Sequence, residues 1–354
     1  MTASSSDIFH FNRQIDDNPL SKFGYLILQK TLTLLLLIST FGISMDTAMA
    51  QKNNSDFALV IHGGAGSATK DVEVIAAREE VLGVALDKGS SILSNGGTSL
   101  DAVEAVIRIL EDSPLFNAGK GAVLTATGTN ELDATIMDGN TRACGAAGGV
   151  TTVKNPISLA RLVMTETRHV LLAAHGADVF AASLEHPQIE IVPREYFRTE
   201  HQIKRLQRTQ EQERLKDTDK MGTVGCVALD CRGDIAAGTS TGGLVNKKHG
   251  RIGDSPIVGA GTFADNRTCG ISCTGVGEDF IRNAVAYDVT ARMLYKRQGM
   301  EKAVEDILGR KDFPVRGGMI GIDHKGRITM QFNTAGMSRA AADSNGLRYI
   351  KIGE

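Results

Sequence analysis

Apolar and polar residues follow two periodicities along the chain, one typical of strands and one typical of helices. The run Phe57–Ile61 is continuously apolar and ends in His62-Gly63-Gly64-Ala65-Gly66, which predicts a buried strand that opens into a glycine loop. The glycine spacing is not that of a dinucleotide or phosphate-binding loop, so we interpret the loop as a wall of an active site. Between Asp71 and Leu93 apolar residues recur at helical spacing, and Asn95-Gly96-Gly97 predicts the end of this helix.

A second helix and a group of short strands are expected next. Thr98, followed three residues later by Asp101, is close to a capping box and favours a helix from about Ser99 to Glu111. Residues Gly121–Val153 contain short β-type runs separated by glycines, which is the pattern of a hairpin meander. Asn155-Pro156 predicts the start of another helix, because proline is tolerated in a first turn.

The C-terminal half repeats this mixture of hairpins and helices. The expected hairpins pair Val224–Leu229 with Ile235–Thr239 and Met319–Asp323 with Arg327–Phe332, and the expected helices lie around Glu278–Arg297 and Glu301–Leu308. Because the strands come in hairpins and the helices in blocks, the pattern predicts an α+β fold. Its sheets should be largely antiparallel, with helices on their outer faces.

Residues 198–220 are dense in charge and contain few apolar side chains. Such a segment buries too little apolar surface to offset the entropy of ordering it, which favours a mobile linker extending over about residues 198–222. A solvated helix is the alternative, given the content of Gln, Glu, Lys and Arg. Either structure would leave the segment exposed.

The N-terminus resembles an export signal. Residues Thr31–Ser44 are apolar, Lys22 and Lys30 precede them, and Ala48-Met49-Ala50 follows, so residues 1–50 are expected to form a signal peptide cleaved after Ala50. The mature protein would then be secreted or periplasmic, and an uncleaved membrane anchor is the alternative. Acidic residues in Met1–Leu20 are unusual for such a leader, which favours a start codon further downstream.

The net charge and the cysteine content exclude some classes of partner and some kinds of cysteine site. The formal net charge of −2 argues against nucleic acid or an anionic membrane as the main partner. Five cysteines cannot all pair within one chain, and their spacing matches neither a disulfide framework nor a zinc site, so buried free thiols are expected.

Gly222-Thr223-Val224-Gly225 carries the most specific chemistry. A threonine hydroxyl within a chain has no base, but cleavage of the bond before Thr223 would give that residue a free α-amine with a reference pKa of about 8. Nucleophile and general base would then belong to one residue. Taken alone, Thr223 would be interpreted as an ordinary β-branched strand residue.

Further motifs surround this threonine in a fixed order. They are Leu110–Gly119 and Asn130–Ala134 before it, and Gly238–Gly243, Asn246-Lys247, Gly250–Pro256 and Cys273–Gly277 after it. With the His62–Gly66 loop, this set resembles the plant-type asparaginases, or isoaspartyl peptidases, of the N-terminal nucleophile hydrolase superfamily. The resemblance covers most of the mature chain. It implies a four-layer αββα sandwich with Thr223 at the start of a central strand.

The same resemblance implies maturation by cleavage between Gly222 and Thr223. Residues 51–222 would form an α-subunit and residues 223–354 a β-subunit, both within one domain and assembled as a pair of αβ units. Thr241 matches the second threonine, whose hydroxyl tunes the nucleophile. Thr274 and the Gly275 amide match the oxyanion hole, where donors meet the developing negative charge.

Substrate recognition is assigned to a short loop. Arg251 and Asp254 can hold the α-carboxylate and the α-ammonium of an amino acid, because a guanidinium pairs bidentately with a carboxylate. A surface ion pair is the alternative interpretation of these two residues. Gly277 is expected to let the backbone approach the substrate, although it could simply form a turn.

The resemblance also implies a structural sodium ion and no cofactor for the chemistry. The loop that matches the family's sodium site would use main-chain carbonyls, which leave little signature in a sequence. The residues concerned are Leu110, Glu111, Ser113, Phe116, Ala118 and Lys120. Asn117 lies at the edge of the active site in this comparison.

The expected activity is hydrolysis of β-aspartyl dipeptides and L-asparagine. Glycosylasparaginase is the nearest alternative, but that branch usually has Asp before the nucleophile and Asn in place of Gly242, whereas this chain has Gly222 and Gly242. A non-catalytic exported amino-acid-binding protein that uses only Arg251 and Asp254 is a second alternative. The sequence does not rank individual dipeptides.

Overall fold

A computed structural model describes residues 56–214 and 222–354. The expected signal peptide and its cleavage after Ala50 lie outside the described residues. No helix in the described ranges is long and apolar enough to cross a membrane.

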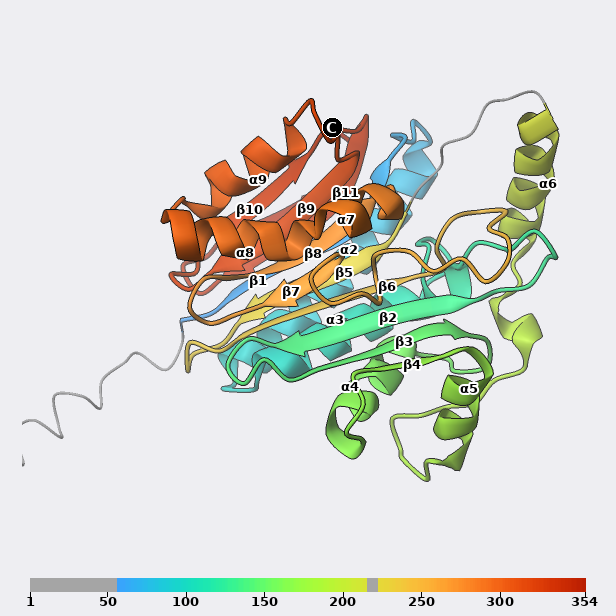
Figure 1. The fold of residues 1–354 in the computed structure, drawn as a ribbon, viewed down its shortest axis with the longest axis horizontal. Helices are drawn as coiled ribbons and strands as arrows, with labels where there is room; N and C mark the ends of the chain where they lie inside the picture. Colours follow the sequence, from blue (N-terminus) through green and yellow to red (C-terminus); the bar gives the residue numbers. More distant parts are fainter. Residues whose placement is uncertain (1–55, 215–221) are drawn as a thin grey trace, which may run out of the picture. The chain divides into compact units, whose positions relative to one another are not determined.

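Two β-sheets form the centre of the protein (Figure 1). The strands of the first are β1 (Ala58–Gly66), β2 (Leu132–Asp138), β3 (Cys144–Val150), β4 (Leu171–Ala173), β5 (Val224–Leu229), β6 (Ile235–Thr241), β11 (Gly336–Asp343) and β12 (Arg348–Lys351). Their spatial order is β12-β11-β1-β5-β6-β2-β3-β4, and the pairs are antiparallel except β3 with β4. The second sheet has the antiparallel order β10-β9-β8-β7, from β7 (Thr262–Ala264), β8 (Cys269–Gly275), β9 (Gly317–Asp323) and β10 (Ile328–Phe332).

Helices cover the outer faces of both sheets. The first sheet carries α2 (Val72–Ser94), α3 (Ser99–Asp112) and α4 (Pro156–Glu166), with α5 (Ala174–Ser183) beside β3 and β4. The second sheet carries α8 (Val285–Lys296) and α9 (Met300–Leu308), while β5 and β6 face β8 across the middle. The αββα order of layers predicted from the sequence is therefore confirmed. Each leucine or isoleucine buried between these layers contributes about 1.5–3 kcal/mol.

Local signals determine where the helices begin and end. The Thr98 hydroxyl accepts a hydrogen bond from the Asp101 amide at 3.0 Å, so α3 begins at the predicted cap. One expected helix, Glu278–Arg297, is instead two helices, α7 (Gly277–Asn283) and α8. Ala284 separates them because its φ of 45° is left-handed, a conformation that ends a helix.

The charged segment before Gly222 is largely helical rather than irregular. Helix α6 spans Glu200–Arg214, so the mobile-linker interpretation is wrong for these residues and the alternative, a helix, is correct. The segment is also not wholly exposed, because Gln202, Leu206 and Thr209 are buried. The Gln202 amide donates to the carbonyl of Gly121 at 2.8 Å, next to the short 3₁₀ turn η1 (Gly119–Gly121). A second 3₁₀ turn, η2 (Arg194–Phe197), precedes the helix.

All five cysteines are free thiols, as expected. Cys226, Cys269 and Cys273 are buried, whereas Cys144 and Cys231 are partly exposed. Burial raises the pKa of the three buried thiols, which keeps them protonated and unreactive.

Strand pairing brings the candidate chemistry to one end of the sheets. Thr223 immediately precedes β5, and the antiparallel register pairs Val224 with Ser240, so Thr223 lies beside Thr241 at the end of β6. Strand β8, which packs against β5 and β6, ends at Gly275. The start of β5 and the ends of β6 and β8 therefore meet at Thr223.

Candidate active site

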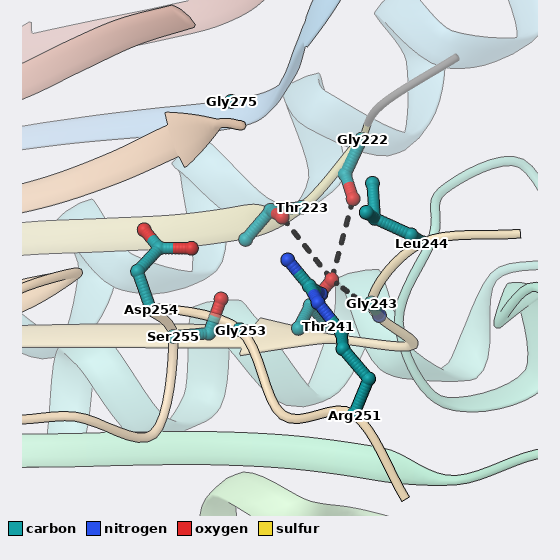
Figure 2. A pocket seen from close by; sticks show the side chains of 10 residues that line it. All are labelled: Gly222, Thr223, Thr241, Gly243, Leu244, Arg251, Gly253, Asp254, Ser255 and Gly275. Carbon is teal, nitrogen blue, oxygen red and sulfur yellow. Dashed lines mark hydrogen bonds between the residues drawn. The ribbon is translucent and has the colours of Figure 1, made fainter. Parts of the chain in front are cut away.

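Thr223 lies in a small pocket with its hydroxyl against that of Thr241 (Figure 2). The two Oγ1 atoms are 3.1 Å apart, and Thr223 is buried. The Gly243 amide donates to Thr241 Oγ1 at 3.0 Å, and Thr241 Oγ1 donates to the Gly222 carbonyl at 3.3 Å. Because the single Thr241 proton is used in this second bond, the Thr223 hydroxyl is the donor to Thr241.

The carbonyl of Gly222, which precedes Thr223, has a second and shorter donor. Asn117 Nδ2 donates to it at 2.6 Å and also to the Gly243 carbonyl at 2.8 Å. The amide of Val123 donates to Asn117 Oδ1 at 2.9 Å, which fixes the orientation of the side chain. Asn117, which sequence reasoning left at the edge of the site, and Thr241 thus polarise the carbonyl that an attack by Thr223 would convert into an oxyanion.

The glycine loop after β1 lies against the same peptide bond. Gly64 has a φ of 104°, and a Cβ there would lie 3.0 Å from Gly222 Cα and 3.1 Å from Thr223 N. Both the left-handed backbone and the close approach require glycine. The loop therefore forms one side of the site, on the flank of the Gly222-Thr223 bond.

Six of the residues selected from sequence line one pocket together: Gly222, Thr223, Thr241, Arg251, Asp254 and Gly275. The full lining is Gly222, Thr223, Thr241, Gly243, Leu244, Arg251, Gly253, Asp254, Ser255 and Gly275. Figure 2 shows Arg251 and Asp254 reaching the pocket from a single loop beside the two threonines. The space inside is about 10 Å³, and Gly222 forms part of the wall. Release of the chain end at Gly222 would therefore open the pocket.

Asp254 presents an unsatisfied carboxylate oxygen. Its side chain is buried, and Oδ2 has no hydrogen-bond partner among the described residues. Burial raises the pKa of Asp254 to about 7; nearby Arg251 opposes this increase, and Glu278 adds to it. A buried acceptor of this kind can bind an ammonium group, which would supply both the missing hydrogen bond and the missing charge.

Arg251 is held by a residue that sequence reasoning missed. Its Nε donates to Glu278 Oε1 and its Nη2 to Glu278 Oε2, both at 2.9 Å. This bidentate bond occupies one edge of the guanidinium and lowers the pKa of Glu278. Glu278 directly follows the Cys273–Gly277 motif, and this position was the available signal in the sequence; its contact with Arg251 was not visible there.

Gly277 lies against the side chains of Arg251 and Asp254 and is not part of the pocket lining. A Cβ at Gly277 would lie 2.7 Å from Arg251 Nη2 and 2.9 Å from Asp254 Oδ1. The absence of a side chain therefore lets the two side chains converge. The expected role of Gly277, close approach of the backbone to a ligand, stays a prediction.

Thr274 and Gly275 reach the site from the second sheet. Gly275 lines the pocket, whereas Thr274 lies just behind it and is fully buried. Thr274 Oγ1 accepts a hydrogen bond from the Ala65 amide at 3.1 Å. Since that bond uses an acceptor position, the Thr274 hydroxyl proton remains available for a further acceptor.

The loop after α3 places backbone carbonyls around two glycines. A Cβ at Gly119 would overlap the Glu111 carbonyl, and one at Gly121 would overlap the Phe116 carbonyl. Among the described residues no group of three or more His, Cys, Asp or Glu side chains could hold a metal ion. Lys120 Nζ lies 5.3 Å from the centre of the Tyr196 ring, so its amine points elsewhere. Backbone carbonyl oxygens such as those of Glu111 and Phe116 are ligands of a type that hard cations accept.

Comparison with known proteins agrees with this geometry. The family described as asparaginase matches residues 55–352. A probable isoaspartyl peptidase/L-asparaginase 2 of Arabidopsis thaliana is 42% identical over 84% of this chain and 99% of its own. An isoaspartyl peptidase of Escherichia coli is 43% identical over 80% of this chain and 91% of its own. A human isoaspartyl peptidase/L-asparaginase is 40% identical over 82% of this chain and 94% of its own.

Burial of Asp254 should set the pH dependence of ligand binding, and the charge of Glu278 should shift it further. Binding of L-aspartate needs ionised Asp254, so affinity should rise as the pH increases through about 7. Glu278→Gln removes a negative charge that raises the Asp254 pKa, so the rise in affinity should occur at lower pH. Calorimetric titrations from pH 5 to 8.5 measure it, with exposed Glu301→Gln as the control. If the rise in affinity stays at the same pH or moves to higher pH in Glu278→Gln, Asp254 is not the ionising group that binds the ligand.

Proposed function

The chain belongs to the asparaginase family, and we propose that it cleaves its own Gly222-Thr223 bond and then hydrolyses β-aspartyl dipeptides and L-asparagine. It is a hydrolase. The observation that carries the proposal is the double hydrogen bonding of the Gly222 carbonyl by Asn117 and Thr241, directly beside the Thr223 hydroxyl.

Self-cleavage follows from that arrangement. Thr223 Oγ1 attacks the Gly222 carbonyl carbon while the Asn117 amide and the Thr241 hydroxyl stabilise the oxyanion. The C–N bond breaks, the nitrogen takes the proton that the Thr223 hydroxyl gives up, and an ester joins Gly222 to the Thr223 oxygen. Water then hydrolyses this ester, which frees the Gly222 carboxylate, the Thr223 hydroxyl and the Thr223 α-amine.

The same threonine then acts on substrate. Its neutral α-amine takes the hydroxyl proton as Oγ1 attacks the side-chain carbonyl of the aspartyl group. The Thr274 hydroxyl and the Gly275 amide stabilise the oxyanion, and the ammonia or amino acid leaves. Arg251 and Asp254 hold the α-carboxylate and α-ammonium, and water releases aspartate from the acyl-enzyme.

The structure disfavours the glycosylasparaginase alternative at one position. A Cβ at Gly242 would lie 2.7 Å from both Ala122 Cβ and Asn117 Oδ1, so an asparagine in its place would displace the side chain that holds the Gly222 carbonyl. Assays with β-aspartyl dipeptides and with glycosylated asparagine separate the two activities. The non-catalytic binding protein requires an intact chain on a denaturing gel.

We also propose that the loop from Leu110 to Lys120 holds a structural sodium ion. The carbonyls of Glu111 and Phe116 around Gly119 and Gly121 support this, because main-chain oxygens are ligands that sodium accepts. A bound ion stabilises the folded state by mass action. The unfolding temperature should therefore fall when sodium chloride is replaced by choline chloride.

Assembly and export complete the proposal. Apolar side chains are exposed at Val170 and Leu171, at the β4 edge of the first sheet, at Val179 on α5, and at Ile191. A surface of this kind supports pairing of two αβ units, which light scattering on the purified protein measures. The apolar run Thr31–Ser44 supports export to a periplasmic or extracellular location, and the intact mass reports cleavage after Ala50.

Thr223→Ala should abolish both chain cleavage and hydrolysis, because it removes the nucleophile of both reactions. Thr223→Ser should cleave more slowly, since serine lacks the β-methyl group that restricts the rotamer. Intact mass and a denaturing gel measure cleavage. Thr329→Ala, which alters a buried threonine of the second sheet, is the control. Fragments of subunit size from the alanine variant would refute the assignment.

Arg251→Lys should reduce kcat/KM for β-aspartyl substrates about 10- to 100-fold, the loss expected for charge-assisted hydrogen bonds of about 1.5–3 kcal/mol. Self-cleavage should persist, because Arg251 makes no hydrogen bond to Gly222 or Thr223 in the described chain. Arg267→Lys alters a similar pair, with Asp265, away from the pocket and is the matched control. Unchanged kinetics in a fully cleaved Arg251 variant would show that Arg251 does not hold the carboxylate.

A further inference from the structure

A chain of buried side chains runs between the two sheets and ends on the nucleophilic residue. His62 Nδ1 lies 3.1 Å from the Thr223 carbonyl oxygen, and His62 Nε2 lies 3.0 Å from Ser272 Oγ. Ser272 Oγ is 2.6 Å from Thr239 Oγ1, which is 2.6 Å from Thr262 Oγ1. All four side chains are completely buried and come from β1, β8, β6 and β7.

The directions of these hydrogen bonds are determined by their two ends. The Thr223 carbonyl can only accept, so His62 Nδ1 must carry a proton. Burial lowers the His62 pKa to about 3, which keeps the ring neutral and leaves Nε2 as an acceptor. Ser272 must then donate to Nε2, so its proton is used and the Thr239 hydroxyl donates to Ser272, while Thr262 donates to Thr239. The Gly261 carbonyl lies 3.3 Å from Thr239 Oγ1 and is the longer of the two contacts available to the Thr239 proton.

Gly225 makes room for this chain. It pairs with His62 across β1 and β5, and a Cβ at Gly225 would overlap both His62 Nε2 and Ser272 Oγ. The glycine two residues after the nucleophile is therefore required by the hydrogen bond between these atoms. This links two separate sequence motifs, the loop that begins at His62 and the Gly222–Gly225 segment.

Cleavage makes the carbonyl of Thr223 more important. Once the bond to Gly222 is cut, residue 223 is attached to the protein only through its own carbonyl carbon. Rotation about the bond between its Cα and that carbon moves the α-amine and the side chain together, so a fixed carbonyl limits where both can point. A displacement of about 1 Å can cost on the order of 100-fold in rate.

We propose that His62 is a positioning residue for the nucleophile: its Nδ1–H, set by donation from Ser272, holds the Thr223 carbonyl so that hydroxyl and amine face the substrate. This rests on the proposed threonine mechanism. His62 itself touches no substrate and transfers no proton. Thr239 and Thr262, the last two side chains of this hydrogen-bonded series, donate toward Ser272 and so leave the Ser272 proton for His62 Nε2.

Two substitutions at His62 separate its two nitrogens. An asparagine amide can place a donor where Nδ1 lies but does not reach Ser272, whereas a glutamine amide reaches Ser272 but lacks the donor near Thr223. Both lose the ring. In cleaved protein, His62→Gln should lower kcat about 10- to 100-fold and His62→Asn distinctly less, with KM changed less than about threefold in both because Arg251 and Asp254 are untouched.

The outcomes are distinct. Equal kcat losses in the two variants, a larger loss in the asparagine variant, or wild-type kcat in the glutamine variant would each overturn the proposal. Unfolding temperatures measured alongside identify losses that only follow stability. If the wild type neither cleaves itself nor hydrolyses β-aspartyl substrates, the proposed function fails, and that result is visible before any variant is made.

A measurement on the unmodified protein tests the geometry even if both variants fail to fold. Nitrogen NMR of histidine-labelled protein should show one ring protonated only at Nδ1 that does not titrate between pH 5 and 8. In Ser272→Ala, which removes the donor to Nε2, the Nε2 resonance should shift because its hydrogen bond is lost, and kcat should fall. Wild-type spectra without an Nδ1-protonated, non-titrating ring would overturn the assignment.

Discussion

The antiparallel pairing of β5 with β6 is the constraint on which the site depends. It places Thr223 opposite the end of β6, so the hydroxyls of Thr223 and Thr241 meet and the Gly222 carbonyl lies within reach of Thr241 and Asn117. Because β5 is central, with β1 on one side and β6 on the other, its start is held from both sides. A nucleophile at a strand edge would lack this support.

Missing side chains are as important here as those present. A Cβ at Gly64 would crowd the Gly222-Thr223 bond, and a Cβ at Gly225 would break the contact of His62 with Ser272. A Cβ at Gly242 would displace Asn117, and one at Gly277 would separate Arg251 from Asp254. Each glycine lies where polar groups converge more closely than a methyl group allows. The glycine-rich motifs are therefore packing requirements of a polar site.

Electrostatics divide the site into two parts. Around Thr223 the groups are neutral, since burial keeps His62 uncharged and the remaining donors are amides and hydroxyls. At the far side of the pocket, Arg251 lies between two carboxylates: Glu278 fixes it, and Asp254 has one oxygen, Oδ2, with no hydrogen-bond partner in the part of the chain that the structure describes. The charged side chains are therefore placed to recognise the two charged ends of an amino acid. The neutral amides and hydroxyls around Thr223 are placed to stabilise the oxyanions.

The sequence alone determined the features that depend on neighbouring residues: the N-cap of α3, the β5–β6 and β9–β10 hairpins, the largely antiparallel α+β class and the order of the motifs around Thr223. The αββα layering followed from the family resemblance that those motifs carry. It did not indicate β8, a short alternating run of small residues, or β11, an alanine-rich stretch without a clear alternation. It also did not decide the helical state of Glu200–Arg214, which depends on packing of Gln202 and Leu206. Only the tertiary structure decided that Glu278 holds Arg251 and that His62 holds Thr223. These contacts join residues 27 and 161 positions apart, and no local preference encodes which distant partner a buried polar group meets.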